Sequence, residues 1–382
     1  DTTTGNAKTT IAAGSNVVNN AEMTQKEVVV SAGDESTTPE TPAAKLANDD
    51  TINADTINIE DGATLDNNDT IAAADGSSAA DVNVKSNADL NLNAGSSTTA
   101  DVTLDAATSD LTITDNGELD GDVISDNGGS INLVADQADI KMSDAITGDI
   151  KGSVDPTTGQ PTDGSYIVTA TTSDPTGADK VVTIDKAIAG ATDVDVNDDT
   201  NAVITDTAYT STSPSTPATV KVGNNGDLTL ENTTSDVKDV ISAISGQDSD
   251  DKYDVTVANT SDGTTNINNT ISGAKTVTGD GGTTNLNSTI TGANAIIAND
   301  GTTNINAGSD NNTTVRIGSA DIVIASGATA GVQTTSDNFA LTNDVTGTDA
   351  TSTLKLDGKS GTAGTASDPG TQFNIASDVN GG

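Results

Sequence analysis

A five-residue phrase that recurs at a fixed interval constrains this chain more than any other feature of its sequence. Residues 264–268 read TTNIN, residues 283–287 read TTNLN and residues 302–306 read TTNIN again, with a step of 19 residues both times. Repeats of about 20 residues that each hold two or three very short strands are typical of a β-solenoid. In that fold one repeat forms one coil, and neighbouring coils pair as parallel strands.

A looser form of the repeat runs through the first half of the chain. Residues 81–84 (DVNV) recur in similar form as residues 101–104 (DVTL), a step of 20. Residues 89–92 (DLNL) recur in similar form as residues 110–113 (DLTI), a step of 21, and again as residues 130–133 (SINL), a step of 20. Each segment alternates apolar and polar residues, as a strand with one buried face does, and turn residues follow it.

The spacing of the aliphatic residues predicts three short faces per coil. In the 19-residue repeats, successive apolar positions are 4, 6 and 9 residues apart, so each face sends one or two aliphatic side chains inward. The sequence therefore predicts an all-β fold, a parallel β-solenoid (β-helix) with about 19–21 residues per coil, a few insertions and one short helix. The apolar positions that define the faces are Ile267, Ile271, Val277, Leu286, Ile290, Ile296 and Ile305.

The register of the repeat divides the chain into four parts. Residues 1–50 are expected to form an N-terminal arm, linker or cap, and residues 51–154 a β-solenoid. Residues 155–260 have poor register and are expected to be an irregular β region with insertions, in which either the solenoid continues or a sandwich-like domain intervenes. Residues 261–382 are expected to be β-solenoid with a loop-like C-terminal segment and a last strand at residues 372–375.

Proline and helix signals mark departures from the repeat. Residues 155–180 contain three Pro around residues 166–168 (YIV) and resemble a hairpin insertion, and residues 206–219 resemble a Ser/Thr-rich loop. Residues 235–246 predict the short helix, because aliphatic residues lie at helical spacing between a capping Ser and a terminal Gly. The stripe of this helix is Val237, Val240, Ile241 and Ile244.

The composition favours a narrow core and excludes several functions. The chain has no Cys, His or Trp and only three Tyr and two Phe, so Ala, Val, Ile and Leu must fill a core a few side chains wide. A net charge of −42 with low hydrophobicity is also typical of disorder, but the regularly placed aliphatic pairs argue against it. The acidic surface repels nucleic acid and anionic membranes, and the single Arg, Arg316, lies in an expected strand at residues 314–317. No segment approaches the ~20 apolar residues that a membrane-spanning helix needs.

The repeated Asn and aliphatic residues are interpreted as structural. Side-chain amides at equivalent positions of successive coils can hydrogen-bond one another along the stack, as in cross-β structures, or can satisfy backbone groups at turns. The aliphatic residue beside each Asn occupies the core. The equivalent residues are Asn266, Asn285 and Asn304 for the amide ladder and Ile267, Leu286 and Ile305 for the core.

Calcium is the predicted metal, and no other cofactor is predicted. Asp193, Asp195, Asn197 and Asp199 offer several oxygen ligands within one segment, as hard cations require. The segment is not an EF-hand loop, since Ile204 stands where that loop needs a Glu. The competing interpretation is a solvated acidic surface whose assembly depends on cations only through charge screening.

Runs such as TTNIN…TISGA and ADVNV…ADLNLNAG resemble the repeats of bacterial β-solenoid surface proteins. That group includes autotransporter and haemagglutinin-type adhesin passengers, surface-layer proteins and extracellular filament proteins. The resemblance covers about half of the chain and implies an extracellular or cell-surface location and a non-enzymatic, structural or adhesive role. The chain begins with Asp1, and a processed or partial form is expected.

The sequence is compatible with three functions. The first is a structural protein that self-associates into a surface layer or filament, with the strand at Val28, Val29 and Val30 added to a neighbouring subunit. The second is a monomeric adhesin that binds glycans or another surface receptor through its insertions. The third is a polysaccharide-active enzyme, which the absence of His and Cys and the few aromatics make the weakest. The expected partners are further copies of the chain.

Overall fold

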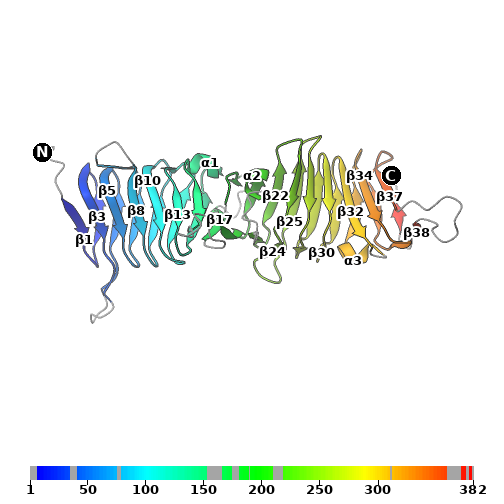
Figure 1. Ribbon diagram of the computed structural model, residues 1–382, viewed down its shortest axis with the longest axis horizontal. Coiled ribbons are helices and arrows are strands. Elements are labelled where there is room, and N and C mark those ends of the chain that lie inside the picture. Colours follow the sequence, from blue (N-terminus) through cyan, green and yellow to red (C-terminus); the bar gives the residue numbers. More distant parts are fainter. Residues whose placement is uncertain are drawn as a thin grey trace, which may run out of the picture. The chain divides into compact units, whose positions relative to one another are not determined.

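The computed structural model describes the chain as two compact units of short parallel strands. It describes residues 7–34, 41–74, 79–152, 166–173, 180–188, 190–209, 218–309, 312–358, 371–375 and 378–380. The first unit comprises residues 1–195 and 211–218, and the second comprises residues 196–210 and 219–382. Within each unit, successive strands lie side by side like rungs (Figure 1).

The first unit contains two main parallel sheets and a shorter third face. Each sheet collects strands from successive coils, so strands that pair are not consecutive in the chain. Two coils contribute two short strands each to the first sheet, β7 with β8 and β12 with β13. One sheet holds β1 (Lys8–Ile11), β3 (Met23–Val30), β5 (Thr51–Ile59), β7 (Thr70–Ala72), β8 (Ala80–Val84), β10 (Ser97–Leu104), β12 (Glu118–Asp120), β13 (Val123–Ser125) and β16 (Ile150–Gly152). The other holds β2 (Asn16–Asn19), β4 (Lys45–Asn48), β6 (Thr64–Asn67), β9 (Asp89–Leu92), β11 (Asp110–Thr114), β14 (Ser130–Ala135), β17 (Tyr166–Thr172) and β19 (Ala191–Val196). The third face holds β15 (Ile140–Lys141), the short helix α1 (Met142–Ala145) and β18 (Val181–Ile184).

The second unit contains three parallel sheets, a two-stranded sheet and two helical turns. One sheet holds β21 (Thr219–Val222), β24 (Ile244–Gly246), β27 (Ile271–Ser272) and β30 (Ile290–Thr291). The second holds β20 (Asn201–Thr205), β22 (Asp227–Asn232), β25 (Asp254–Asn259), β28 (Thr276–Asp280), β31 (Ala295–Ala298), β33 (Asp321–Ile324), β36 (Val345–Gly347) and β39 (Val379–Asn380). The third holds β23 (Val237–Val240), β26 (Thr264–Ile267), β29 (Thr283–Leu286), β32 (Thr302–Gly308), β34 (Thr329–Thr334) and β37 (Thr353–Asp357). The remaining elements are β35 (Asn338–Leu341), β38 (Gln372–Ile375), α2 (Asp206–Tyr209) and α3 (Thr314–Ile317).

The core of each unit is a narrow column of aliphatic side chains. Along β10 and its neighbours every second residue is buried, which is the period of a strand with one face inside. The buried set consists largely of Ala, Val, Ile and Leu, most of them with no exposed surface. Tyr166, Tyr253 and Phe339 are the largest fully buried side chains of the described residues.

The repeats stack in register, which confirms the predicted parallel β-solenoid. Each residue of β26 pairs with the residue 19 positions later in β29, and β29 pairs in the same way with β32. The looser repeats of the first unit also pair as predicted, Asp81 opposite Asp101 and Asp89 opposite Asp110. The three faces of one coil are β26, β27 and β28, each of which carries a buried aliphatic residue.

Coil length varies more than the predicted 19–21 residues. Asn16 of β2 pairs with Lys45 of β4, a step of 29, and Ser130 of β14 pairs with Ile167 of β17, a step of 37. The register of the strands is fixed by their inward side chains, since a slip of one residue would expose them. The turns between strands meet no such constraint, so they absorb the extra residues.

Two local predictions are corrected because the neighbouring coil overrides local preference. The helix expected over residues 235–246 is wrong, since this segment forms β23 and β24, which pair with β26 and β27. Val240 and Ile244 face the core, whereas Val237 is 64% exposed. The strand expected around Arg316 is also wrong, because residues 314–317 form α3. From this turn the Arg316 guanidinium donates hydrogen bonds to the backbone carbonyls of Asn287 (3.3 Å) and Ala307 (3.4 Å).

Two segments expected to stand apart from the solenoid are built into it. Val28–Val30, expected to be an assembly arm, belong to β3, which pairs with β1 on one side and β5 on the other. Residues 166–168, expected to be a hairpin, begin β17, which pairs in parallel with β14. Both segments carry buried side chains, so their aliphatic character serves the core. Of the other expected insertion, residues 206–209 form α2. Residues 155–165, 174–179 and 210–217 lie outside the described residues.

An amide ladder runs along the outside of the 19-residue repeats, as the sequence predicts. Asn285 Nδ2 donates a hydrogen bond to Asn266 Oδ1 (2.8 Å), and Asn304 Nδ2 donates to Asn285 Oδ1 (2.9 Å). Beside these residues, Ile267, Leu286 and Ile305 point inward and are buried. A second ladder joins Asn268, Asn287 and Asn306.

A further amide ladder is buried inside the first unit. Asn19 Nδ2 donates to Asn48 Oδ1 (2.7 Å), Asn48 Nδ2 donates to Asn67 Oδ1 (2.8 Å), and Asn67 Nδ2 donates to Thr98 Oγ1 (3.0 Å). The Asn48 amide also donates to the backbone carbonyl of Thr70 (3.0 Å). Asn48 and Asn67 have no exposed surface, so no solvent could replace these bonds.

The burial of this ladder predicts a difference between two Asn→Ala substitutions. Asn48→Ala should lower the free energy of unfolding by about 1–3 kcal/mol, because buried partners lose their hydrogen bonds. Asn287→Ala removes a link of an exposed ladder, and water can satisfy the partners, so its effect should stay below about 1 kcal/mol. Urea denaturation followed by circular dichroism compares the two. Equal losses of stability would contradict a structural role for the buried ladder.

Candidate functional site

The first coil ends in strands with one unpaired edge. Strand β1 pairs with β3 and β2 pairs with β4, and no described residue pairs with the opposite side of either strand. The carbonyls of Ala7 and Ile11 accept hydrogen bonds from the β3 side. Because a parallel strand directs the backbone groups of alternate residues to the same side, Lys8 and Thr10 direct their N–H and C=O groups outward. We call the outer sides of β1 and β2 the N-terminal edge.

The last coil is open in the same way. Strands β37, β38 and β39 pair with β34, β35 and β36, and within the described part of the chain nothing pairs with their other sides. The Thr353 N–H donates to the Ala328 carbonyl in the preceding coil, so Leu354 and Leu356 direct their backbone groups outward. We call these outer sides the C-terminal edge. Unpaired strand edges of this kind are ready to pair with another chain.

Exposed aliphatic side chains gather on the strands of these two edges. Val18 on β2 is 52% exposed, Ile375 on β38 is 52% exposed and Val379 on β39 is 47% exposed. Among the described residues the other large exposed aliphatics are Val237 and Val315. Three of the five thus lie on terminal strands, which have a neighbouring coil on one side only.

Phe373 adds a partly covered aromatic ring to the C-terminal edge. Its ring meets the edge of the buried Phe339 ring at a centroid distance of 5.8 Å and an interplanar angle of 70°. Phe373 itself is half-buried, whereas Phe339 in the preceding coil is buried. The Phe373 ring covers the Phe339 ring of the preceding coil. No described coil covers the Phe373 ring in turn.

The N-terminal edge differs from the rest of the chain in charge. The net charge is −42 over 382 residues, yet residues 7–31 contain two Lys, two Glu and no Asp. Within this segment Lys8 Nζ lies 2.9 Å from Glu27 Oε1. This segment, which holds β1, β2 and β3, therefore has no net charge, and a second acidic chain can approach it with less repulsion than it meets at the acidic side faces.

Stacked carboxylates make the sides of both units strongly acidic. Asp89 lies opposite Asp110 in neighbouring strands, and Asp227 lies opposite Asp254. Burial, and then the charge of Asp110, raises the pKa of Asp89. Burial, and then the charge of Asp254, likewise raises the pKa of Asp227. These side faces repel one another between copies as well as within a chain.

The raised pKa of Asp89 predicts that replacing it with a neutral residue increases the free energy of unfolding, and that this increase depends on pH. A raised pKa means that the folded chain holds the proton more tightly, so this stabilisation is present below the ordinary value of 3.8 and is lost as pH rises through the folded value. Asp89→Asn should therefore raise the free energy of unfolding at pH 7 by about 0.2–1 kcal/mol, the range for cross-strand pairs. The gain should vanish near pH 3.

Thermal denaturation at the two pH values measures this difference. The exposed Asp126 provides the control variant, Asp126→Asn, for which no comparable gain is expected. A gain for Asp89→Asn that is the same at pH 3 and pH 7 would show that stacked charge is not its cause.

The predicted calcium ligands are placed on a strand and the turn after it. Asp193 and Asp195 alternate with the buried Val194 along β19 in the first unit. In the second unit, Asn197 Oδ1 accepts a hydrogen bond from Gln247 Nε2 (3.2 Å), and Asp199 Oδ1 accepts one from Asn225 Nδ2 (3.2 Å). Over the described ranges, no three or more acidic side chains are grouped to hold a metal ion. Calcium binding at this segment stays a prediction.

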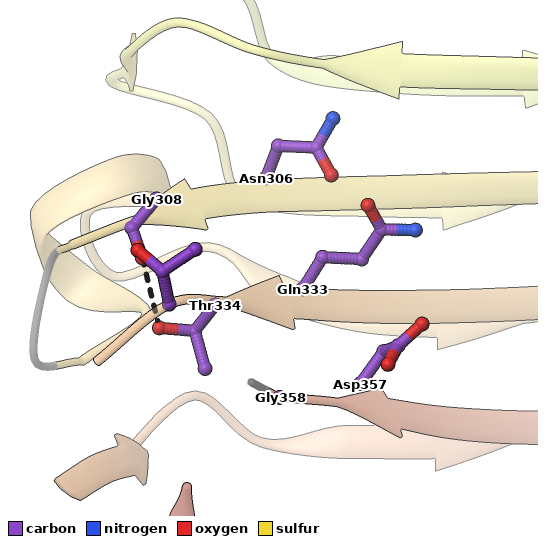
Figure 2. A pocket seen from close by; sticks show the side chains of 7 residues that line it. Asn306, Gly308, Gln333, Thr334, Asp357 and Gly358 are labelled. Atoms are coloured by element: carbon purple, nitrogen blue, oxygen red, sulfur yellow. Dashed lines mark hydrogen bonds between the residues drawn. The ribbon is translucent and has the colours of Figure 1, made fainter. Parts of the chain in front are cut away.

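A shallow pocket of about 340 Å³ lies where β32, β34 and β37 end. Figure 2 shows Asn306, Gln333 and Asp357 on the same side of the three strands, and they lie opposite one another in register. Thr334 Oγ1 donates to the Gly308 carbonyl (3.0 Å) and closes one end (Figure 2). The amide ladder stops here, because Asn306 Oδ1 is buried without a hydrogen-bond partner among the described residues. The amide of Gln333 and the carboxylate of Asp357 are the groups here that can bind hydroxyl groups.

The terminal strands β1 and β2 were missed as a site by sequence reasoning. A signal does exist, because Val17-Val18-Asn19, Leu46-Ala47-Asn48 and Leu65-Asp66-Asn67 share an aliphatic–x–Asn pattern. These segments are β2, β4 and β6, which pair in register. The step of 29 residues between the first two hid the repeat, since the expected step was 19–21.

Comparisons with known proteins leave the chain without an assigned family. No family model, no curated protein and no solved structure matches it. None of the helices among the described residues has the length and apolar character to cross a membrane. The geometry of the edges, the pocket and the acidic faces therefore carries the functional argument.

Proposed function

We propose that the protein is a non-enzymatic, extracellular structural protein that self-assembles into a surface layer or filament through β contacts between subunits. The observation that carries this proposal is the presence of unpaired parallel strand edges on both the first and the last described coils. Proteins that function as monomers usually cover or charge such edges. Here β1 and β37 carry Lys8, Lys355 and Asp357, but β2, β38 and β39 carry exposed aliphatic side chains, and residues 7–31 have no net charge.

The non-enzymatic role is supported by the chemistry that the chain offers. It has no His and no Cys, which removes the commonest general bases and nucleophiles. The carboxylate pairs at Asp89/Asp110 and Asp227/Asp254 follow from the stacking of equivalent residues, so catalysis is not needed to explain them. The single Arg is engaged with backbone carbonyls of neighbouring coils.

The extracellular location and the kind of assembly are proposed from the style of the repeats. Thr-, Asn-, Asp- and Gly-rich coils resemble those of bacterial surface-layer proteins, filament proteins and adhesin passengers. The strong negative charge disfavours nucleic acid and anionic membranes as partners. Further copies of the chain are the proposed partners.

A glycan-binding adhesin is the second candidate, and the pocket at Gln333 and Asp357 favours it. Amide and carboxylate groups on successive strands can accept and donate hydrogen bonds to neighbouring hydroxyl groups of a sugar. The pocket lacks an aromatic platform among its lining residues, so binding would depend on these polar contacts. This candidate differs from the first in predicting a monomer.

Sedimentation velocity and negative-stain electron microscopy test the proposed function. The full chain should form multimers as its concentration rises, and 0.15 M NaCl should promote them, because salt screens the repulsion between acidic faces. Calcium chloride at the same ionic strength should act like NaCl if screening is the only effect, and more strongly if calcium is bound. Isolated monomers under all of these conditions would contradict the proposal.

A further inference from the structure

We propose that the C-terminal edge of one copy docks in parallel on the N-terminal edge of the next, so that the copies join head to tail. This inference rests on the proposed self-association and specifies its partner, its surfaces and its direction. The docked strands are β1 and β2 of one copy and strands from the set β37, β38 and β39 of the other. The contact continues, between copies, the stacking that holds the coils together within each unit.

Backbone chemistry defines what each edge can accept. The outward N–H and C=O groups of Lys8 and Thr10 alternate along β1 as those of Leu354 and Leu356 do along β37. Inside each unit, such groups pair with a parallel strand of the adjoining coil. A parallel strand from a second copy is therefore the partner that reproduces the internal geometry on both sides.

Exposed aliphatic groups at both edges favour a head-to-tail contact over a symmetric dimer. Val18 lies at the N-terminal edge, and Ile375 and Val379 lie at the C-terminal edge. A two-fold dimer that joined two N-terminal edges would leave the C-terminal groups of both copies exposed. A contact between unlike edges covers both sets with one interface, and such a contact adds copies beyond two.

Charge favours contacts between the edges over contacts between the side faces. Two C-terminal edges would bring together the Asp378 carboxylates of both copies, whereas the charge of Asp357 is offset by Lys355, 3.5 Å away on the same strand. Side-to-side contacts would oppose the acidic faces that carry stacked Asp residues. Residues 7–31, which hold the N-terminal edge and β3, have two Lys balanced by two Glu, so an acidic chain meets no net repulsion there.

A proline in β1 tests the backbone contact. Thr10 has an exposed side chain and directs its N–H outward, so Thr10→Pro removes a docking donor and keeps the hydrogen bonds from β1 to β3. The matched control Thr10→Ala keeps the N–H. Thr10→Pro should raise the concentration at which half of the chains are associated by about tenfold or more, and Thr10→Ala should leave it nearly unchanged. The circular dichroism spectrum and melting temperature of both variants report whether the solenoid is intact.

A charge substitution tests the side-chain contact independently of proline. Val18→Asp places a carboxylate in the proposed interface, and Val379→Asp does so on the opposite edge. Val315→Asp is the matched control, because Val315 is exposed to a similar extent (48%) on α3. Val18→Asp and Val379→Asp should each weaken association, whereas Val315→Asp should not. An equimolar mixture of the two edge variants should stop at short complexes, since each keeps one intact edge.

The outcomes separate this inference from the proposed function. If Thr10→Pro and Val18→Asp associate as the wild type does, the head-to-tail contact is wrong and the copies associate through another surface. If the wild type stops at dimers, a symmetric contact replaces the one proposed. If the wild type remains monomeric throughout, both the contact and the proposed function are wrong.

Discussion

The in-register stacking of each strand on its counterpart in the adjoining coil is the interaction on which the rest of the structure depends. It forms the backbone hydrogen bonds, and it places like side chains above one another because equivalent residues repeat. Stacked Ile and Leu residues make a dry column that needs almost no aromatic side chains. Stacked Asn residues form amide ladders such as Asn266–Asn285–Asn304. Stacked Asp residues, as at Asp89 and Asp110, are the unfavourable consequence of the same geometry.

The proposed assembly follows from two consequences of this stacking. Among the described residues, the first and last strands of the stack have backbone groups that no other strand pairs with. The sides of the stack accumulate the charge of every coil, which opposes lateral association. The absence of net charge over residues 7–31 and the exposed Val18, Ile375 and Val379 are the features of the described residues from which we propose association at the edges.

The fold class could be predicted because the repeat and its two-residue alternation are properties of the sequence itself. Residues 264–306 specify their own register, since a slip would move Ile267, Leu286 and Ile305 out of the core. The segment with Val237, Val240 and Ile244 could not be assigned in the same way. Its apolar spacing suits a helix as well as two strands joined by a corner, and only the adjoining β26 and β27 select the strands. Partners distant in sequence decided this element.

The candidate site was harder to predict than the fold. The exposed Val18 and the buried Asn19 are adjacent in a short strand, and their roles depend on which coil comes first. The aliphatic Val28–Val30 segment was the more conspicuous choice for assembly, but β1 and β5 occupy both of its sides. A strand edge is free when no other strand pairs with it, and the sequence alone does not reveal which strands pair. The amide repeats, in contrast, were predictable because they recur at a constant step.

Hydrogen exchange followed by mass spectrometry tests the central claim most directly, namely that stacking protects every coil except the two terminal edges. At concentrations where the chain is monomeric, amides of inner strands such as β5, β10, β26 and β29 should exchange slowly. The outward amides of β1, β2 and β37 should exchange fast, and they should become protected when the protein associates. Terminal strands that are as protected as inner strands in the monomer would contradict the account.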